Sequence, residues 1–424
     1  MTRPSREALA AQESTLAAQY DAFCAKGLAL DMTRGKPSAA QLSLSDALDG
    51  ILAGNYKDAK GTDTRNYGGL DGLPEARELF ATMLQVSPDE VLIGGNSSLT
   101  LMHTSALFAW LYGPSGAGSA WRAEPGVKFL CPVPGYDRHF GICEDLGIDM
   151  VPVAMNEDGP DMDEVERLVK GDAAIKGMWC VPRFSNPSGI VYSDAVVDRI
   201  AQLGKLAAPN FRVFWDNAYA VHALHRGAPA LASIMDACRR HGTEDSVLIF
   251  GSTSKVTFAG AGLAFMGASK ANLAVISKHL GKATIGPDKV NQLRHVRFLK
   301  DAEGILAHMD GHAQLLQPRF EAVLSTLERE LAGTDMGSWT KPEGGYFVSF
   351  DTIPGVASTV VALAGAAGVK LTPAGATWPY GKDPADRNIR LAPSFPSLND
   401  IQAAMDVFVC CVKLATVRAW LAEG

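Results

Sequence analysis

Short apolar runs alternate with helix-like segments between about residue 75 and residue 270. The runs that we predict to be strands are Glu90–Ile93, Val127–Cys131, Ile175–Val181, Phe211–Trp215, Val247–Phe250 and Leu263–Met266. The helical patterns between them are Leu99–Tyr112, Met162–Lys170 and Ala195–Leu206. Alternation of this kind is typical of a mainly parallel sheet with helices packed on it. The pattern therefore predicts an α/β domain.

The pattern changes after about residue 300. A long helical pattern at Ala307–Leu331 leads into a predicted strand at Gly345–Phe350. A further helix, a short β region at Asn388–Leu391 and a C-terminal helix at Leu398–Leu421 follow. This mixture predicts a smaller α+β domain.

The chain has 424 residues, which is too long for one small core. We therefore expect two domains that share an interface. The large domain is predicted at 61–300 and the small C-terminal domain at 301–424. The N-terminal segment, 1–60, begins with an amphipathic helical pattern and is predicted to pack on the small domain.

The composition narrows the class of protein. Hydrophobic residues make up 47% and charged residues 20%, as in ordinary soluble proteins. The net charge of −7 disfavours nucleic-acid binding, which needs clustered Lys and Arg, but leaves room for a basic pocket that binds a small anion. Neither a signal peptide nor an apolar run of about 20 residues is present, so we expect a cytoplasmic protein without a membrane span.

The cysteines number seven, an odd count, and none of them has C-x-x-C spacing. This argues against paired structural disulfides and against a zinc site, and it favours a reducing compartment. We expect no bound metal.

Candidate binding and catalytic residues follow the predicted strands. In open α/β sheets, ligands bind at the carboxyl ends of the strands. After the strand at 90–93, Asn96, Ser97 and Ser98 lead into a helix, whose free backbone N–H groups suit a phosphate. A plain helix N-cap is the alternative. The segment is neither a Walker motif nor G-x-G-x-x-G, so nucleotide binding is not supported.

Two turns follow the next strands. Tyr136 comes after a Pro-Gly turn and could stack on a planar heterocycle or simply pack. Asn186 begins the turn Asn-Pro-Ser-Gly and could hydrogen-bond a ring hydroxyl. A turn without a further role is the alternative for Asn186.

Asp216 and Lys255 end two further strands. Asp216 could be an N-cap, a metal ligand or the partner of a protonated ring nitrogen, and it lacks the nearby companions that a metal needs. Lys255 places a charged group near a buried strand end, which suits a Schiff-base lysine whose pKa is lowered by desolvation. A surface lysine with a buried stem is the alternative.

Together these residues supply a phosphate cradle, a stacking ring, a hydroxyl partner, a ring-nitrogen partner and a nucleophilic amine. Those are the parts that a pyridoxal 5′-phosphate (PLP) site needs. The motifs Asn186-Pro-Ser-Gly, Asp216-x-x-Tyr219 and Ser252-x-Ser-Lys255 resemble those of the fold-type-I PLP aminotransferases of class I/II. More narrowly, the chain is similar to MocR-type aminotransferases without the DNA-binding domain, and to aspartate aminotransferases of subgroup Ic.

The resemblance implies an α/β fold with a mainly parallel, seven-stranded-type sheet in a large PLP domain, beside a smaller α+β domain. It assigns catalytic roles to Lys255, which carries the cofactor and moves a proton, to Asp216, which keeps the ring nitrogen protonated, and to Tyr219. The implied cofactor-binding residues are Asn96, Ser97, Ser98, Tyr136, Asn186, Asp216, Tyr219, Ser252, Ser254, Lys255 and Tyr67.

The resemblance also implies a homodimer with shared active sites. Tyr67 lies in a segment similar to the family's Tyr-x4-Gly, in which the tyrosine reaches the phosphate of the neighbouring subunit. Arg390 matches the arginine that grips the substrate α-carboxylate, a task that suits a bidentate guanidinium. Gly35 lies in Arg-Gly-Lys-Pro, similar to the family's mobile segment. The implied substrate-binding residues are Gly35, Asn186, Arg390 and Lys282.

Two departures from the family pattern stand out. The family's phosphate-binding arginine is absent, because the corresponding positions are Gly262 and Leu263. Lys282 is our candidate to replace it, ahead of Arg34 and Lys36. The arginine that binds a distal substrate carboxylate also has no clear match, and the candidates are Lys282, Arg294 and Arg297.

The sequence thus predicts a PLP-dependent aminotransferase with a ping-pong mechanism, acting on an amino acid, aspartate in the first place, and on a 2-oxo acid, 2-oxoglutarate. A PLP-dependent lyase or decarboxylase is the first alternative, because the cofactor supports several reactions. A non-catalytic PLP-binding sensor is the second. The intact pair Lys255 and Asp216 argues against the sensor.

Overall fold

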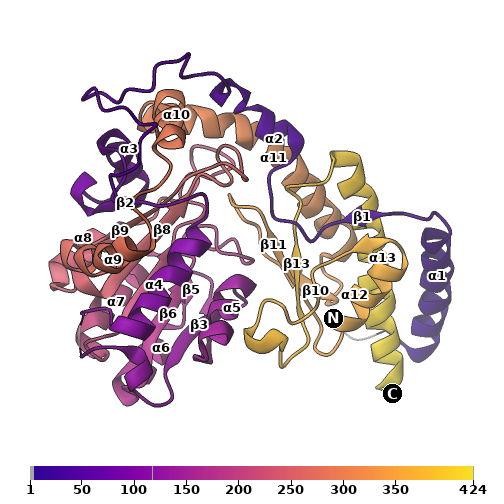
Figure 1. The fold of residues 1–424 in the computed structure, drawn as a ribbon. Coiled ribbons are helices and arrows are strands. Elements are labelled where there is room, and N and C mark those ends of the chain that lie inside the picture. Colours follow the sequence, from indigo (N-terminus) through magenta and orange to yellow (C-terminus); the bar gives the residue numbers. More distant parts are fainter. Residues whose placement is uncertain (1–3, 117, 424) are drawn as a thin grey trace.

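The computed structural model describes residues 4–116 and 118–423. One part of the molecule is built on a sheet with the strand order β2-β9-β8-β7-β6-β3-β4-β5 (Figure 1). Its strands are β2 (Val91–Ile93), β3 (Lys128–Val133), β4 (Asp149–Asn156), β5 (Gly159–Pro160), β6 (Ile175–Cys180), β7 (Arg212–Asp216), β8 (Val247–Ser252) and β9 (Ala264–Ala268).

The predicted fold class is confirmed. Strands β4, β3, β6, β7 and β8 pair in parallel, whereas β9 is antiparallel to both β8 and β2. The two-residue β5 pairs antiparallel with β4 at the edge of the sheet. Strand β4 was missed, because its residues alternate between buried and exposed and do not form an apolar run.

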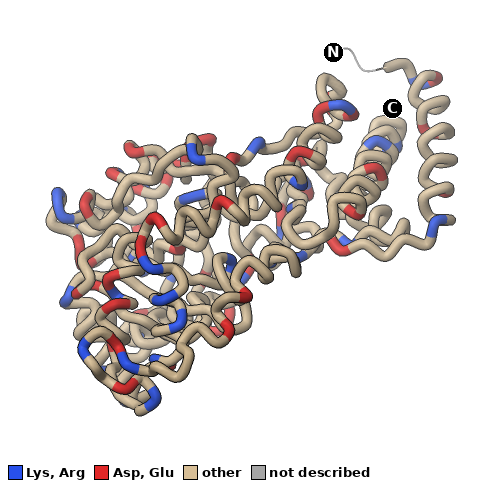
Figure 2. Tube along the Cα trace, turned by 90° about the horizontal axis from the view of Figure 1, so that it is seen from above, with Lys and Arg blue, Asp and Glu red and all other residues tan. Residues whose placement is uncertain are grey.

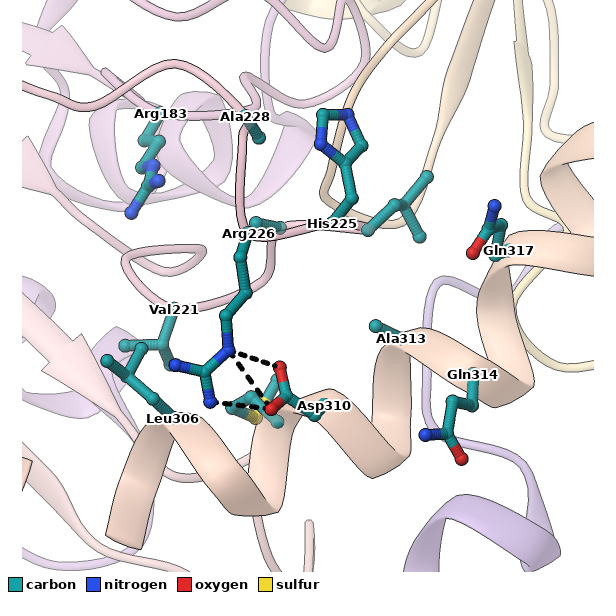
Figure 3. A pocket seen from close by; sticks show the side chains of 13 residues that line it. Arg183, Val221, His225, Arg226, Ala228, Leu306, Asp310, Ala313, Gln314 and Gln317 are labelled. Atoms are coloured by element: carbon teal, nitrogen blue, oxygen red, sulfur yellow. Dashed lines mark hydrogen bonds and ion pairs between the residues drawn. The ribbon is translucent and has the colours of Figure 1, made fainter. Parts of the chain in front are cut away.

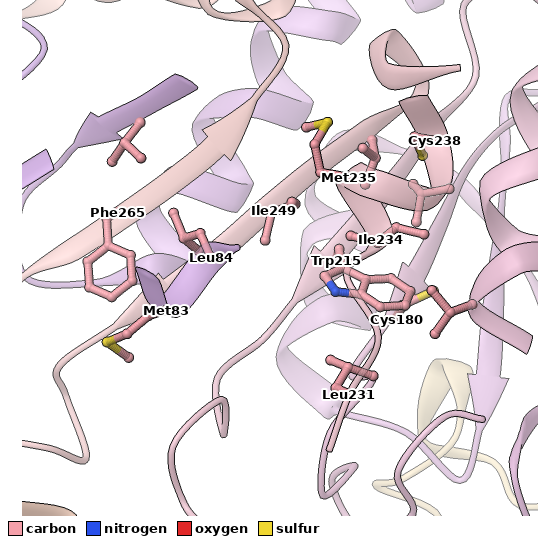
Figure 4. Close-up of a cluster of buried hydrophobic side chains, with 14 of the residues drawn as sticks. Met83, Leu84, Cys180, Trp215, Leu231, Ile234, Met235, Cys238, Ile249 and Phe265 are labelled. Atoms are coloured by element: carbon pink, nitrogen blue, oxygen red, sulfur yellow. The ribbon is translucent and has the colours of Figure 1, made fainter. Parts of the chain in front are cut away.

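Helices cover both faces of this sheet. They are α3 (Pro74–Leu84), α4 (Ser98–Tyr112), α5 (Asp137–Leu146), α6 (Met162–Gly171), α7 (Asp194–Leu206), α8 (Ile234–His241), α9 (Lys270–Ala283) and α10 (Lys289–Leu299). Successive strand residues point to opposite faces. Accordingly, Trp215 and Ile249 belong to one buried cluster (Figure 4), while their neighbours Phe214 and Phe250 belong to another. Full burial of each such side chain stabilises the fold by roughly 1.5–3 kcal/mol.

The C-terminal part contains a three-stranded antiparallel sheet with the order β10-β11-β13. Its elements are α11 (Ala302–Leu331), β10 (Gly337–Trp339), β11 (Val348–Thr352), α12 (Ala357–Ala366), β12 (Val369–Lys370), β13 (Asn388–Leu391) and α13 (Leu398–Ala422). The strand predicted at Gly345–Phe350 begins later, since Gly345 has a left-handed backbone (φ +78°) and a Cβ there would press on Phe184.

The N-terminal segment runs along the C-terminal part. Its elements are α1 (Arg6–Cys24), β1 (Leu30–Asp31) and α2 (Ala39–Ser43). Helix α1 packs against α13 (Figure 1). Strand β1 pairs in parallel with β12. The remaining short 3-10 helices are η1 (Asp46–Leu48), η2 (Pro88–Glu90), η3 (Trp121–Ala123), η4 (Glu244–Ser246) and η5 (Pro379–Gly381). The domain boundaries at residues 60 and 300 stay a prediction.

Acidic and basic residues are mixed along the chain (Figure 2). The seven cysteines are free, and of these Cys24 is exposed while the others are buried. Over residues 4–116 and 118–423, no helix has both the length and the apolarity needed to cross a membrane.

Candidate active site

Lys255 lies on a turn directly after β8. The backbone N–H groups of Val256 and Thr257 both donate to the carbonyl of Thr253, at 2.9 Å, and this fixes the turn. The Nζ atom of Lys255 lies 4.9 Å from the ring centroid of Tyr219. Burial lowers the pKa of Lys255, and the nearby Asp216 carboxylate offsets part of this effect. The amine is therefore easier to deprotonate than that of an ordinary lysine.

Asp216 is the last residue of β7 and faces the same site. Its Oδ2 atom accepts a hydrogen bond from His139 Nε2 at 2.9 Å, and both side chains are buried. The His139 ring stacks on Trp179, with centroids 4.5 Å apart. The second oxygen, Oδ1, is buried and has no hydrogen-bond partner among the described residues. Since a buried carboxylate oxygen without a partner is costly, Oδ1 is suited to receive a proton-bearing group of a ligand.

The sequence did not single out His139 as a site residue. It lies three positions after Tyr136, whose ring it meets edge-on at 5.0 Å. A histidine beside Phe140 on the buried face of α5 was the available signal. His139 fixes the orientation of Asp216, as partners of functional side chains commonly do.

Arg390 and Asn186 were predicted from distant parts of the sequence and lie together. Arg390 Nη1 donates to Asn186 Oδ1 and to Asp137 Oδ1, both at 3.3 Å, and Nη2 donates to Thr372 Oγ1 at 3.4 Å. Its guanidinium lies over the Phe347 ring, 4.8 Å from the centroid. Arg390 Nε is buried and has no partner in the described part of the chain. The arginine thus keeps donor capacity for an anion.

Gly35 lies beside this arginine. A Cβ atom at this position would overlap the ring of Phe347, the same ring that stacks on Arg390. Only glycine permits this close approach. The structure therefore places Gly35 on the Arg390 side of the site.

The predicted phosphate-binding residues also gather. Ser254 Oγ donates to the carbonyl of Asn96 at 3.3 Å, and the Ser254 N–H donates to Ser252 Oγ at 3.4 Å. Ser97 is the N-cap residue of α4 but makes no side-chain cap hydrogen bond, and Ser98 is the first residue of the helix. A plain capping role for Ser97 is therefore not supported, and the start of the helix retains donors for an anion.

The arginine missing at 262–263 has a physical reason. A Cβ on Gly262 would approach Thr253 Oγ1 to 2.7 Å, and Leu263 is buried in the apolar core. Of the replacement candidates, Arg34 pairs with Asp31 at 3.1 Å, and Lys36 Nζ lies 4.2 Å from the centroid of the Phe395 ring. These two cations are engaged elsewhere. Lys282 is exposed in the last turn of α9.

Arg294 and Arg297 of α10 both donate to backbone carbonyls. Arg294 Nε donates to the carbonyl of Leu48 at 3.2 Å, and Arg297 donates to the carbonyls of Leu52 and Lys57 at 3.3 and 3.2 Å. Both arginines brace the backbone of the segment around η1. The role of either arginine towards a distal substrate carboxylate stays a prediction.

Tyr67 lies at the surface of this chain. Its side chain is 81% exposed. Lys289 Nζ holds the flanking backbone by donating to the carbonyls of Asn66 and Gly68, at 2.8 and 2.5 Å. A large aromatic ring is thus presented to the outside on a fixed segment.

An open pocket of about 500 Å³ lies beside the segment that follows β7 (Figure 3). It is lined by Val221 and Arg226, and by Asp310 of α11, which pairs with Arg226 at 2.6 Å. Tyr219 and His222 of the same segment contact Lys255 instead. The pocket is therefore separate from the residues that surround the lysine.

Buried histidines near the site predict acid sensitivity. Burial lowers the pKa of His295 and of His312 from 6.5 to about 4. Between pH 6.5 and about pH 4, these histidines bind protons in the unfolded chain but not in the folded chain. The free energy of unfolding should therefore fall as pH decreases through this range. The slope is up to about 1.4 kcal/mol per pH unit for each histidine. Urea unfolding at a series of pH values measures it. His295→Asn should flatten the slope, whereas Gln314→Asn at an exposed position should not. An unchanged slope in His295→Asn would contradict the expectation.

Comparison with known proteins identifies the family. The sequence matches the family described as aspartate amino-transferase over residues 4–423. The chain belongs to this family. An aminotransferase-type protein of Mycolicibacterium smegmatis is 50% identical over 99% of this chain and 98% of its own length. The aspartate aminotransferase of Corynebacterium glutamicum is 46% identical, over 94% of this chain and 92% of its own length.

Solved structures have the same fold. That of an aspartate transaminase from Corynebacterium glutamicum has a TM-score of 0.95 and 45% identity, and covers 98% of this chain and 97% of its own. A second structure is LysN of Thermus thermophilus, an α-aminoadipate aminotransferase complexed with N-(5′-phosphopyridoxyl)-L-leucine. It has a TM-score of 0.74, 23% identity and 95% coverage of both chains, and this similarity shows the fold alone. The prediction of a fold-type-I aminotransferase is confirmed, and the chain is an aspartate aminotransferase-like enzyme. The finer subgroup stays a prediction.

Proposed function

We propose that this aminotransferase uses PLP to transfer the amino group of aspartate to 2-oxoglutarate in two successive half-reactions. The observation that carries the proposal is a lysine amine with a lowered pKa opposite a buried carboxylate oxygen that has no partner, Asp216 Oδ1. The name of the Corynebacterium glutamicum relative supports the choice of aspartate.

The residues of the site fit PLP. The bound cofactor would supply a carbonyl carbon and an electron sink. Asp216 Oδ1 would hold the proton of the ring nitrogen, and Asn186 and Tyr219 would donate to the ring oxygen. Burial raises the pKa of Tyr219 well above its usual range, so its hydroxyl keeps the proton that it donates.

Tyr136 would stack on the cofactor ring. Burial raises the pKa of Tyr136 to about 12, so this phenol also stays neutral. The phosphate would bind at the start of α4, where Ser97 and Ser98 offer backbone and hydroxyl donors, together with Asn96, Ser252 and Ser254.

Lys255 Nζ acts as nucleophile and then as base and acid. Its lowered pKa makes the neutral amine easier to form, and the neutral amine can take the proton from the substrate Cα and return it. The Tyr219 ring lies against the lysine amine, and Phe347 and Gly35 lie on the Arg390 side. Arg390 binds the α-carboxylate, which turns the Cα–H bond towards the lysine.

We also propose a cytoplasmic homodimer with shared sites. The 81% exposed Tyr67 would reach the phosphate of the neighbouring subunit, and Lys282 would lie close to it. A Cβ on Gly281 would lie 3.5 Å from Leu70, so the Lys282 region packs against the segment that carries Tyr67. Sedimentation of Tyr67→Ala and Lys282→Ala, with the Kd for PLP of each, would test this assignment; unchanged PLP affinity in both would reject it.

The proposed reaction is tested by spectra and products. Aspartate or glutamate added to the PLP-loaded enzyme should bleach its visible absorbance, and 2-oxoglutarate should restore it. Steady-state rates at several concentrations of both substrates should give parallel double-reciprocal lines. No absorbance change would reject the proposal, and carbon dioxide or an eliminated product would point to the lyase alternative.

Arg390→Lys is expected to raise the KM for aspartate by about 10- to 100-fold, because one ammonium replaces a bidentate guanidinium. The affinity for PLP should change little, since Arg390 lies on the substrate side. Steady-state kinetics and PLP titration measure both quantities. Arg418→Lys, on the exposed face of α13, is the matched control. An unchanged KM in Arg390→Lys would show that another cation binds the α-carboxylate.

A further inference from the structure

The backbone of the turn that carries Lys255 is held by side chains from distant segments. The carbonyl of Lys255 accepts hydrogen bonds from His222 Nε2 at 3.2 Å and from Tyr346 Oη at 3.4 Å. Two further donors meet at the next carbonyl, that of Val256. Such a concentration of donors fixes the orientation of both peptide groups, and hence the direction in which the lysine leaves the turn.

The donors at Val256 come from α11. His308 Nε2 lies 2.7 Å and His312 Nε2 lies 2.9 Å from the Val256 carbonyl oxygen. Burial lowers the pKa of both histidines, so each ring is neutral and carries one proton. A carbonyl only accepts, so a histidine that donates to Val256 carries its proton on Nε2, and the two Nε2 atoms lie 3.3 Å from each other.

Gln41 determines the direction of the hydrogen bonds behind this turn. Its Oε1 accepts from the backbone N–H of Ser38 at 3.1 Å, which fixes the orientation of the amide. The Nε2 group therefore faces Tyr346 Oη at 3.0 Å and His312 Nδ1 at 3.2 Å. Its two protons serve these two acceptors, so the Tyr346 hydroxyl must donate onwards to Lys255 and the His312 Nε2–H to Val256.

Gln41 is also tied to the segment around Gly35. It forms a capping box with Ser38 at the start of α2. Arg319 Nη1 donates to Ser38 Oγ at 3.1 Å and to the carbonyl of Ser394 at 2.8 Å, and Ser394 Oγ donates to the carbonyl of Lys36 at 3.1 Å. The chain from Gly35 to Gln41 is thus one connected unit. Gly35 itself lies against Phe347, the neighbour of Tyr346.

We propose that Gln41 is a positioning residue that couples the segment 35–38, on the substrate-carboxylate side, to the turn of Lys255 through Tyr346 and His312. The inference rests on the proposed function, because it assumes that the position of Lys255 limits the rate. Gln41, Tyr346 and His312 touch neither the lysine Nζ nor Arg390. They act through the backbone of the turn.

Gln41→Met and Tyr346→Phe test this relay with little change in shape. Methionine is nearly isosteric with glutamine but offers no donors, and phenylalanine lacks only the hydroxyl. Each variant should lower kcat by about 10- to 100-fold, the effect of a small misplacement of a reacting group, with the KM for aspartate changed by less than about threefold. Gln314→Met, at an exposed position of α11, is the control and should leave both unchanged.

The double variant Gln41→Met/Tyr346→Phe separates a relay from two independent effects. If both residues act through one chain of hydrogen bonds, the loss in kcat of the double variant should equal that of the larger single variant. If the two losses multiply, or if Gln41→Met keeps the wild-type kcat, the proposal is overturned. If Gln41→Met folds poorly, Tyr346→Phe alone still tests whether the Tyr346 hydroxyl is needed for the full kcat. A wild-type kcat in Tyr346→Phe would then overturn the proposal.

Hydrogen exchange of the cofactor-free protein gives a readout that does not need the reaction. The amides of Val256 and Thr257 should exchange faster in Gln41→Met than in wild type, whereas Gln314→Met should match wild type. Equal exchange in all three proteins would overturn the relay. If wild type fails the spectral test with aspartate but the exchange difference is present, the proposed substrate is wrong and the coupling stands.

Discussion

Lys255→Ala is expected to lower the kcat of aspartate transamination by about 10,000-fold. The variant removes the amine whose pKa is lowered by burial and whose Nζ lies 4.9 Å from the centroid of the Tyr219 ring. Without Nζ, the proposed reaction lacks its nucleophile and its base at the substrate Cα. Single-turnover kinetics with PLP and aspartate measure the loss.

The same substitution should not destabilise the fold. Burial disfavours the charged form of Lys255, so the folded state is penalised at pH values below the ordinary pKa of lysine, and alanine removes this penalty. The Tm of the cofactor-free protein at neutral pH should therefore stay equal or rise. Lys205→Ala, at an exposed position of α7, is the control with unchanged kcat. If Lys255→Ala retained a tenth of the wild-type kcat, the assignment of the nucleophile would be wrong.

The centre of the site could be predicted from sequence because it depends on one topological rule. Strands β6, β7 and β8 are adjacent and parallel, so the residues that follow them meet at one edge of the sheet. Asn186, Asp216 and Lys255 follow these strands in turn. Each is weak evidence alone, and the parallel sheet is what makes their combination specific.

The surroundings of the site could not be predicted in the same way. Gln41 and His312 are separated by 271 positions, and nothing in either local pattern indicates that they touch. Arg294 and Arg297 were considered as substrate ligands because their charge is visible in the sequence. Their partners are backbone carbonyls, which the sequence does not display. Partners fixed by tertiary packing are therefore the information that only the structure supplies.

Asp216→Asn is expected to lower kcat by about 100- to 1,000-fold, the range found when one preorganised electrostatic partner is removed. His139 Nε2 is a donor, so the amide oxygen of the asparagine must face it, as Oδ2 does at 2.9 Å in wild type. The amide NH₂ then takes the place of Oδ1. A donor in that place cannot accept a proton-bearing ring nitrogen, so the electron sink is lost while the shape of the site is kept.

Three measurements separate charge from shape in this experiment. The Tm of Asp216→Asn should stay within a few degrees of wild type, because the hydrogen bond to His139 and the packing on Trp179 are retained. Asp310→Asn, which removes a carboxylate from the exposed pair with Arg226, should leave kcat unchanged. Asp216→Glu keeps the charge but displaces it by one methylene, and should lie between wild type and Asp216→Asn. If Asp216→Asn kept more than about a tenth of the wild-type kcat, the proposed catalytic role of Asp216 Oδ1 would be wrong.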